Sequence, residues 1–344
     1  MKNLFLLVVL TLGMSAHAQT LNSFENGKVA DADQINENFK LLEEQLAGKA
    51  NIPSFQNNIW ASTGWEAIYV DCDANSAALE ESKAAIERGR NRIHVIIKGA
   101  CILKENLFYI TSQHVFLDGS DNGGSTSADG CASSATIRAV DPIRPLNISV
   151  TNGGTLLMAC LTLDHESDVL LTAYTGSAIR TDAGVNAANQ NLVVSMRNSL
   201  FRTFFNRHYK AITLDSGSYA EITTLSGGDL SNPFNFGDVT LRARSSLNCR
   251  ICGSQPPNGD YSSNAPWLGG TINNLSLETA SSLIFGLYIE GDVNIGSVTA
   301  KLGSSLLLDA SRSQWCSDLF IDQSTISSGS VIEKELGNQI NCDR

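Results

Sequence analysis

Short apolar strands, separated by Gly, Ser and Asn, recur along the chain between residues 269 and 333. The expected inward positions alternate with polar ones; they are Leu283, Phe285, Leu287, Ile289, Val293, Ile295, Val298 and Ala300. The pattern restarts at Ser304 and at Gly329, which lie 23 and 25 residues after the preceding starts (304 − 281 and 329 − 304). Strands in such a period predict stacked coils, since no single coil can bury its own inner face. We therefore predict an all-β, single-stranded, right-handed parallel β-helix.

A helix followed by a strand is expected where this stack begins. Asn75 or Ser76 can cap a helix with Ala78, Leu79 and Ile86 on one face, and Gly89 ends it. The next residues alternate with period two, placing Ile93, Val95 and Ile97 on one side of a strand. This opening resembles the N-terminal cap of pectate-lyase-like (pectin-lyase-like) β-helices and phage tailspikes. The resemblance implies that the helix covers the open end of the stack, and we assign residues 51–344 to one β-helix domain.

The first 18 residues have the features of a cleaved signal peptide. Lys2 is followed by the apolar run 4–12 and by the A-x-A sequence Ala16-His17-Ala18. No Cys follows the cleavage site, and no later apolar run approaches the ~20 residues of a membrane span. We expect a secreted, extracellular or cell-surface protein, with the periplasm as the other destination, and no membrane span.

Residues 19–50 are predicted to form an oligomerisation helix. Its apolar positions are Ala32, Ile35, Phe39, Leu42 and Leu46, spaced 3, 4, 3 and 4 as in a coiled coil. A helix this short is marginal alone, so two interpretations are open: packing on its own domain, or self-association as a trimer.

The same segment resembles the start of many exported bacterial and tail-fibre-like proteins. The matching positions are Phe24, Gly27, Ala30, Ala32, Asn36, Asn38, Phe39 and Leu42. The resemblance implies oligomeric display and no chemistry. We therefore expect a homotrimer through Ile35, Phe39, Leu42 and Leu46.

Eight cysteines in an exported chain predict disulfides. On the order of 100 pairings are open, and pairing of neighbours gives Cys72–Cys101, Cys131–Cys160, Cys249–Cys252 and Cys316–Cys342. Cys249 and Cys252 form a C-x-x-C pair that ends a strand, which favours a loop-closing disulfide over a redox site. No second such pair exists for zinc, and the histidines lack metal-ligand spacing, so we expect no metal and no cofactor.

The charge of −11 at pH 7 disfavours nucleic acid and makes a strongly anionic polysaccharide an awkward partner. Enzymatic signatures of related folds are also missing. Arg138, Pro142 and Arg144 are not spaced as R-x-x-P-x-x-R, the pattern of pectate lyases, and Asp164-His165 lacks the Trp of their W-x-D-H stretch. The paired Asp and G-H-G signatures of polygalacturonases are absent too. Catalytic residues are therefore unassigned.

The strongest candidate surface lies around residues 239–267. If Val239, Leu241 and Ala243 point inward, Arg242 and Arg244 point outward, roughly 7 Å apart. The neighbouring insertion carries Tyr261 and Trp267, so these four residues are candidates for glycan binding; solvated charges and an anchored loop are the alternative.

We accordingly expect a secreted or surface-displayed adhesion or glycan-binding module without catalysis, with extracellular polysaccharide as a partner. The alternatives are a polysaccharide lyase or hydrolase with an untypical site, and a purely structural fibre or matrix subunit.

Overall fold

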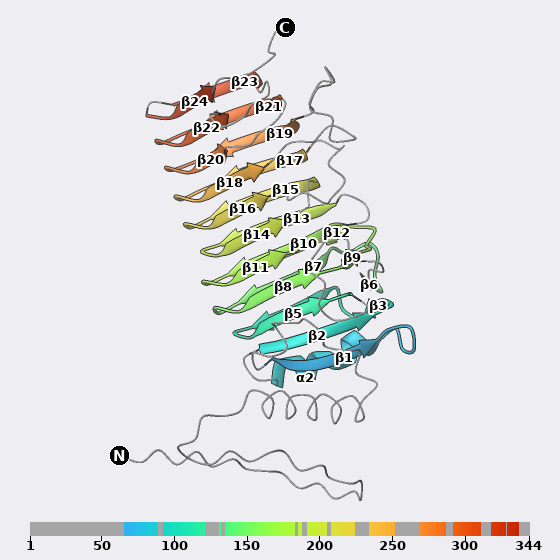
Figure 1. Cartoon of the computed structure of the whole chain (residues 1–344). Helices are drawn as coiled ribbons and strands as arrows, with labels where there is room; N and C mark the ends of the chain where they lie inside the picture. The colour runs from blue at the N-terminus through green and yellow to red at the C-terminus, as the bar shows by residue number, and fades with distance from the viewer. Residues whose placement is uncertain are drawn as a thin grey trace, which may run out of the picture. The chain divides into compact units, whose positions relative to one another are not determined.

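The computed structural model describes residues 65–88, 92–120, 131, 135–182, 185–187, 191–204, 208–223, 234–251, 269–286, 292–310, 318–327 and 329–336. The chain divides into two compact units, residues 1–56 and 57–344, and all described residues belong to the second. The predicted signal peptide and oligomerisation helix lie outside the described residues. Every strand pair in the described part is parallel, and the strands stack in chain order from β1 to β24 (Figure 1), which confirms the predicted parallel β-helix.

Three sheets run along the stack in the described residues. The 11-stranded sheet, here sheet A, contains β1 (Glu66–Asp71), β2 (Arg92–Lys98), β5 (His114–Asp118), β8 (Thr155–Ala159), β11 (Ala178–Thr181), β14 (Leu200–Phe204), β16 (Tyr219–Thr223), β18 (Ser246–Ile251), β20 (Ser282–Phe285), β22 (Ser305–Ala310) and β24 (Val331–Leu336). The 4-stranded sheet B contains β3 (Ala100–Leu103), β6 (Ala135–Ala139), β9 (Leu161–Leu163) and β12 (Asn186–Ala187). The 9-stranded sheet C contains β4 (Leu107–Thr111), β7 (Leu146–Thr151), β10 (Val169–Tyr174), β13 (Leu192–Arg197), β15 (His208–Asp215), β17 (Phe234–Leu241), β19 (Gly270–Leu277), β21 (Val293–Ala300) and β23 (Leu319–Ile326).

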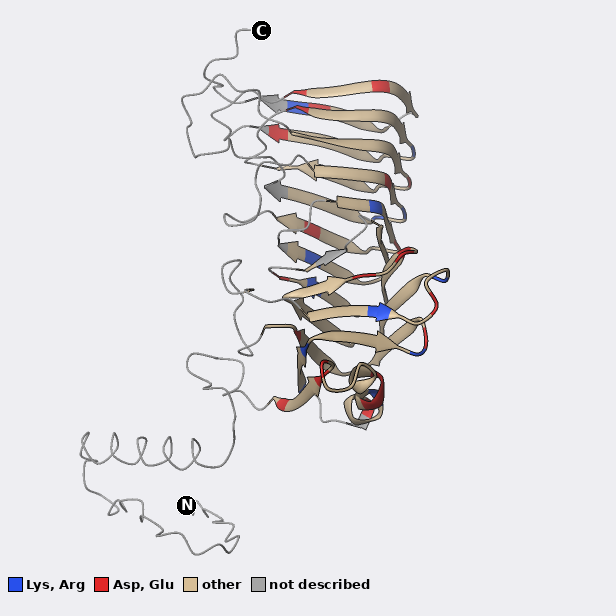
Figure 2. Cartoon of the chain, turned by 90° about the vertical axis from the view of Figure 1, so that its right-hand side faces the viewer, with Lys and Arg blue, Asp and Glu red and all other residues tan. Residues whose placement is uncertain are grey.

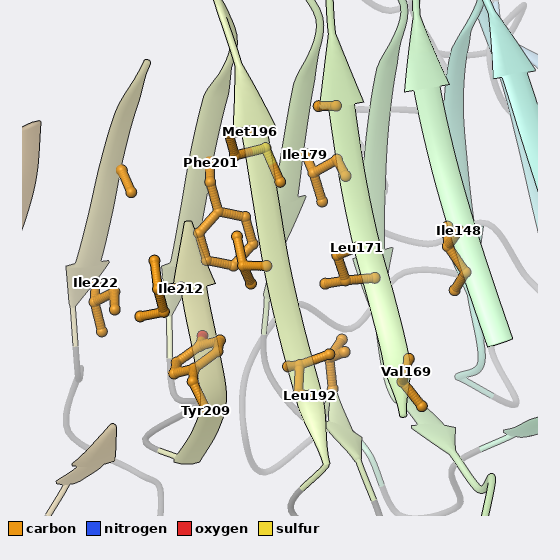
Figure 3. Packing of buried hydrophobic residues seen from close by; sticks show 14 of the residues in the cluster. Ile148, Val169, Leu171, Ile179, Leu192, Met196, Phe201, Tyr209, Ile212 and Ile222 are labelled. Atoms are coloured by element: carbon orange, nitrogen blue, oxygen red, sulfur yellow. The ribbon is translucent and has the colours of Figure 1, made fainter. Parts of the chain in front are cut away.

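The core follows the predicted alternation. Leu283, Phe285, Val293, Ile295, Val298 and Ala300 are all buried, while Leu287 and Ile289 lie outside the described residues. Figure 3 shows how inward side chains of successive coils stack on one another. Tyr209 lies between Phe201 and Phe236, with ring centroids 6.1 and 5.6 Å away. Burial raises the pKa of the Tyr209 hydroxyl, and the neighbouring Thr203 offsets this only in part.

The repeat at the end of the chain has a different register from the predicted one. Ser282 pairs with Ser305, which confirms the 23-residue repeat (305 − 282). The next coil pairs Ser305 with Val331, so its repeat is 26 residues (331 − 305) instead of 25. Val331 is consequently 45% exposed, and the following Ile332 packs against the core. A shift of one residue exchanges the two faces of a strand, which is why the error changed the inward residue.

The predicted cap helix is α2 (Ala78–Arg88). Its buried residues Leu79 and Ile86 join the core, as expected from their spacing. Asn75, rather than Ser76, provides the cap, because its Oδ1 accepts the Ala77 backbone N–H at 3.1 Å. Lys83 of the helix donates to the carbonyl of Leu107 at 2.8 Å, so α2 also covers part of the edge of β4.

The turn from each sheet C strand to the next sheet A strand is fixed by a buried serine. The hydroxyl of this serine donates at 2.6 Å to the carbonyl three residues earlier at Ser177, Ser218, Ser245, Ser281 and Ser304. The backbone N–H groups of Ser199 and Ser218 also donate to the serine hydroxyl of the next coil, each at 3.2 Å. The serines thus satisfy buried backbone groups and hold neighbouring coils in register.

Two predicted disulfides are present, Cys72–Cys101 and Cys131–Cys160. Each closes a separation of 29 residues and should stabilise the fold by about 2–4 kcal/mol. Cys249 is disulfide-bonded, but Cys252, Cys316 and Cys342 lie outside the described residues. Among the described residues, no helix is long and apolar enough to cross a membrane.

Candidate functional site

The strands of sheet C bend at one level in the second half of the stack. In β17 the buried residues Phe236 and Val239 are separated by two outward residues, Gly237 and Asp238. The same interruption separates Ile272 from Leu275 in β19 and Ile295 from Val298 in β21. Strict alternation would bury every second residue, so this two-residue step turns the strand around a corner of the coil.

Gly237 leaves a hollow on the outside of this corner. A Cβ at Gly237 would lie 2.2 Å from the carbonyl oxygen of Lys210, so the close approach of β15 and β17 requires glycine. The hollow has a volume of about 320 Å³, and its lining residues are His208, Tyr209, Lys210, Asn235, Gly237, Asp238 and Asn273. We call it the Gly237 concavity.

Hydrogen bonds between coils hold the polar side chains around the concavity. Asn274 donates its amide to Asp238 Oδ1 at 2.8 Å, and Ser297 donates to Asn274 Oδ1 at 2.7 Å. On the other side, the Thr271 hydroxyl donates to Asn235 Oδ1 at 3.2 Å. Adjacent coils therefore position the carboxylate and amide groups before any ligand arrives, which lowers the ordering cost of binding.

The lysine of the concavity is already paired. Lys210 Nζ donates to both carboxylate oxygens of Asp168, at 2.6 and 2.8 Å. Both side chains are partly exposed, so the pair contributes little stability, but it directs the ammonium group toward Asp168. Asp238 is the one carboxylate among the described lining residues.

The concavity can bind hydroxyl-rich molecules better than it can cleave them. Side-chain amides offer both donors and acceptors, which match the two-way hydrogen bonding of sugar hydroxyls. Glycoside hydrolysis generally needs two carboxyl groups about 5–10 Å apart. Asp238 has no second carboxylate beside it among the described lining residues.

The predicted inward position of Ala243 is wrong. β17 ends at Leu241, and Ala243 is exposed with a φ of 50°. Arg244 follows with a φ of 63°, so both residues belong to the tight turn before β18. Arg242 lies 3.6 Å (Nε–Oε2) from Glu278, an exposed pair. Figure 2 shows Lys and Arg dispersed singly over the described strands and turns on that side of the stack, without a basic patch.

The predicted partners of these arginines, Tyr261 and Trp267, lie outside the described residues. The described ends of their segment are Ile251, which ends β18, and Gly269, which precedes β19. Gly270 pairs with Phe234 at the start of β17, whereas Arg242 follows the end of that strand. Strand geometry puts the two ends of β17 about 23 Å apart. The segment therefore begins and ends away from Arg242 and Arg244, and its second end lies on the strand that borders the Gly237 concavity.

A second buried polar group was not expected from the sequence. His94 is 1% exposed, and its Nε2 lies 3.0 Å from Oδ2 of Asp118, which is fully buried. The backbone N–H and hydroxyl of Ser120 donate to the other carboxylate oxygen, at 2.9 and 2.6 Å. The His94 ring also stacks on Phe116 with centroids 4.6 Å apart.

This group is structural in its geometry. The carboxylate lies between serine and histidine, whereas a nucleophilic triad needs the histidine in the middle. His94 was expected to have a surface or packing role, and it packs. The sequence signal, Asp118-Gly119-Ser120 after a strand, marks a turn but does not identify His94 as the partner.

The sequence matches no family model, no curated protein and no solved structure. Its function therefore has to be argued from the fold and from these sites.

Proposed function

We propose that this chain is an exported, secreted or surface-displayed β-helix module that binds glycans at the Gly237 concavity without cleaving them. The observation that carries the proposal is the concavity itself, in which amide, carboxylate, imidazole and ammonium groups surround a glycine floor. The signal-peptide pattern and the two disulfides support export. The resemblance to pectate-lyase-like and tailspike β-helices agrees with a carbohydrate ligand.

The location of the site differs from the one expected from the sequence. Arg242 and Arg244 belong to a turn, so we move the proposed contacts to Asn235, Asp238 and Asn273. Tyr261 and Trp267 stay candidates for an aromatic contact, because their segment leads into β19 beside the concavity. Catalysis and a purely structural role are the alternatives that the experiment must separate.

Replacing Asp238 and Asn273 together by Ala should weaken glycan binding about 5- to 100-fold. The estimate takes two lost hydrogen-bonding side chains at about 0.5–1.5 kcal/mol each. A glycan array probed with the full mature chain would identify ligands, and calorimetry would compare the variants. Thr325→Ala is the matched control, since Thr325 is an exposed residue of the sheet C strand β23 and does not line the concavity.

Three outcomes would contradict the proposal. Unchanged affinity in the double variant would put the binding site elsewhere. Release of reducing sugar or of unsaturated product would make the protein a hydrolase or a lyase. No binding to any glycan would favour the structural fibre or matrix role.

The proposal includes self-association through the predicted helix of residues 19–50, which the described residues do not include. Phe39→Asp would place a charge on its apolar seam, where an assembled coil cannot solvate it. Light scattering should give a trimer for the parent chain and a monomer for the variant, with unchanged circular dichroism from the β-helix. Lys40→Asp, next to the seam, should leave the trimer intact; a monomeric parent at micromolar concentration would refute this part.

A further inference from the structure

Charge around the Gly237 concavity is balanced or negative. Lys210 is held by both oxygens of Asp168, and Asp238 adds a second carboxylate. The exposed Arg242, at the far end of β17, lies beside Glu278. An anionic sugar polymer would thus meet no unopposed cation from these residues, on a chain whose net charge is −11 at pH 7.

Polar residues continue from the concavity along the helix axis. On one side, Asn235, Thr271 and Asn294 pair in register across β17, β19 and β21. On the other side, Asp238, Asn274 and Ser297 pair across the same three strands. Successive members of each column are about 4.8 Å apart, the spacing of neighbouring strands.

The line between these two columns is low at two of its three positions. Gly237 and Gly296 carry no side chain there, and a Cβ would lie 2.2 and 2.7 Å from the carbonyl oxygens of Lys210 and Asn273. Both glycines are thus required by the approach of the preceding strand. The surface offers hydrogen-bonding groups on two sides of a low line that crosses the strands.

We infer that the ligand is an uncharged glycan, with hydroxyl or acetamido substituents, lying along the helix axis across β17, β19 and β21. This inference rests on the proposed function. Amide side chains on both columns bind hydroxyl and acetamido groups equally well, since each has a donor and an acceptor. The absence of an unopposed cation at the concavity selects against uronates and sulfated sugars.

The test uses the full mature chain and two oligosaccharide series of two to six residues. Chitin- and cellulose-derived oligosaccharides are the uncharged probes, and oligogalacturonates are the acidic ones. Calorimetry at low and high ionic strength should show uncharged oligosaccharides binding at least tenfold more tightly than oligogalacturonates of the same length. Affinity for the uncharged series should rise with length and stay independent of salt, because no charge pairing is involved.

A double variant in β21 tests the orientation. Asn294 and Ser297 do not line the concavity, so Asn294→Ala with Ser297→Ala should leave disaccharide affinity unchanged and remove most of the gain with length. An equal loss for every length would overturn the axial orientation. Tight, salt-sensitive oligogalacturonate binding that Asp238→Ala with Asn273→Ala abolishes would overturn the uncharged ligand and leave the proposed function standing. Failure to bind either series or any arrayed glycan would overturn both.

Discussion

Replacing Gly237 by Ala should lower the free energy of unfolding by about 3 kcal/mol or more. The added Cβ would lie 2.2 Å from the carbonyl oxygen of Lys210, a main-chain atom that no rotamer change can move. The strands β15 and β17 would have to separate, in a closely packed stack where overpacking typically costs about 1–3 kcal/mol. Because large β proteins can unfold irreversibly, both the denaturant midpoint and the unfolding rate should be measured by circular dichroism.

Gly286→Ala is the matched control for this change. The nearest atom to a Cβ at Gly286 is Oδ1 of Asn248 at 3.5 Å, an ordinary contact, and the residue has no positive φ. Its stability should change by less than about 1 kcal/mol, since the loss of backbone freedom in the unfolded chain favours Ala slightly. Equal stabilities for the two variants would show that β15 and β17 do not approach as closely at Gly237 as described.

The architecture could be predicted because burial imposes a simple pattern on each strand. Residues such as Leu283 and Phe285 must point inward in every coil, so the alternation and its repeat are written directly into the chain. The cap helix was predictable for the same reason, from the spacing of Leu79 and Ile86. The register of the last coil was not, because Val331 and Ile332 are adjacent apolar residues and either could continue the pattern.

The turn around Arg244 was missed because it lacks the usual glycine. Comparable turns place Gly at a positive φ, as at Gly176, Gly217 and Gly303. Ala243 and Arg244 adopt the same conformation without glycine, so the sequence looked like a continuing strand. The signal that would have located the turn is Ser245, the serine that bonds back to the carbonyl of Arg242 in the recurring pattern.

The Gly237 concavity could not be predicted from the sequence. It joins Lys210, Asp238 and Asn273, which come from three different coils. The segments between these coils differ in length: Tyr219 pairs with Ser246, 27 residues on, and Ser246 pairs with Ser282, 36 residues on (246 − 219 and 282 − 246). Counting residues therefore gives no register, and the neighbours across coils appear only in the folded chain.

Removing the carboxylate of Asp118 should destabilise the N-terminal coils by about 3–5 kcal/mol. Asp118→Ala would leave the imidazole of His94 and both donors of Ser120 buried without their acceptor. The loss of one partner from a buried polar pair has this magnitude, because the remaining group keeps its desolvation cost and loses its compensation. Asp118→Asn is the matched control, since an amide oxygen can still accept from Ser120 and the side chain keeps its volume.

Unfolding of the two variants would be followed by circular dichroism, and hydrogen exchange would locate the effect in β2 and β5. We expect the Ala variant to be less stable than the Asn variant by at least about 1–2 kcal/mol, the difference between an unsatisfied and a satisfied buried group. The loss of exchange protection should be largest near His94 and Phe116, whose rings stack above this carboxylate's strand neighbours. If the Ala and Asn variants were equally stable, the hydrogen bonds of Asp118 would contribute nothing, and the group would have to be kept for another reason than packing.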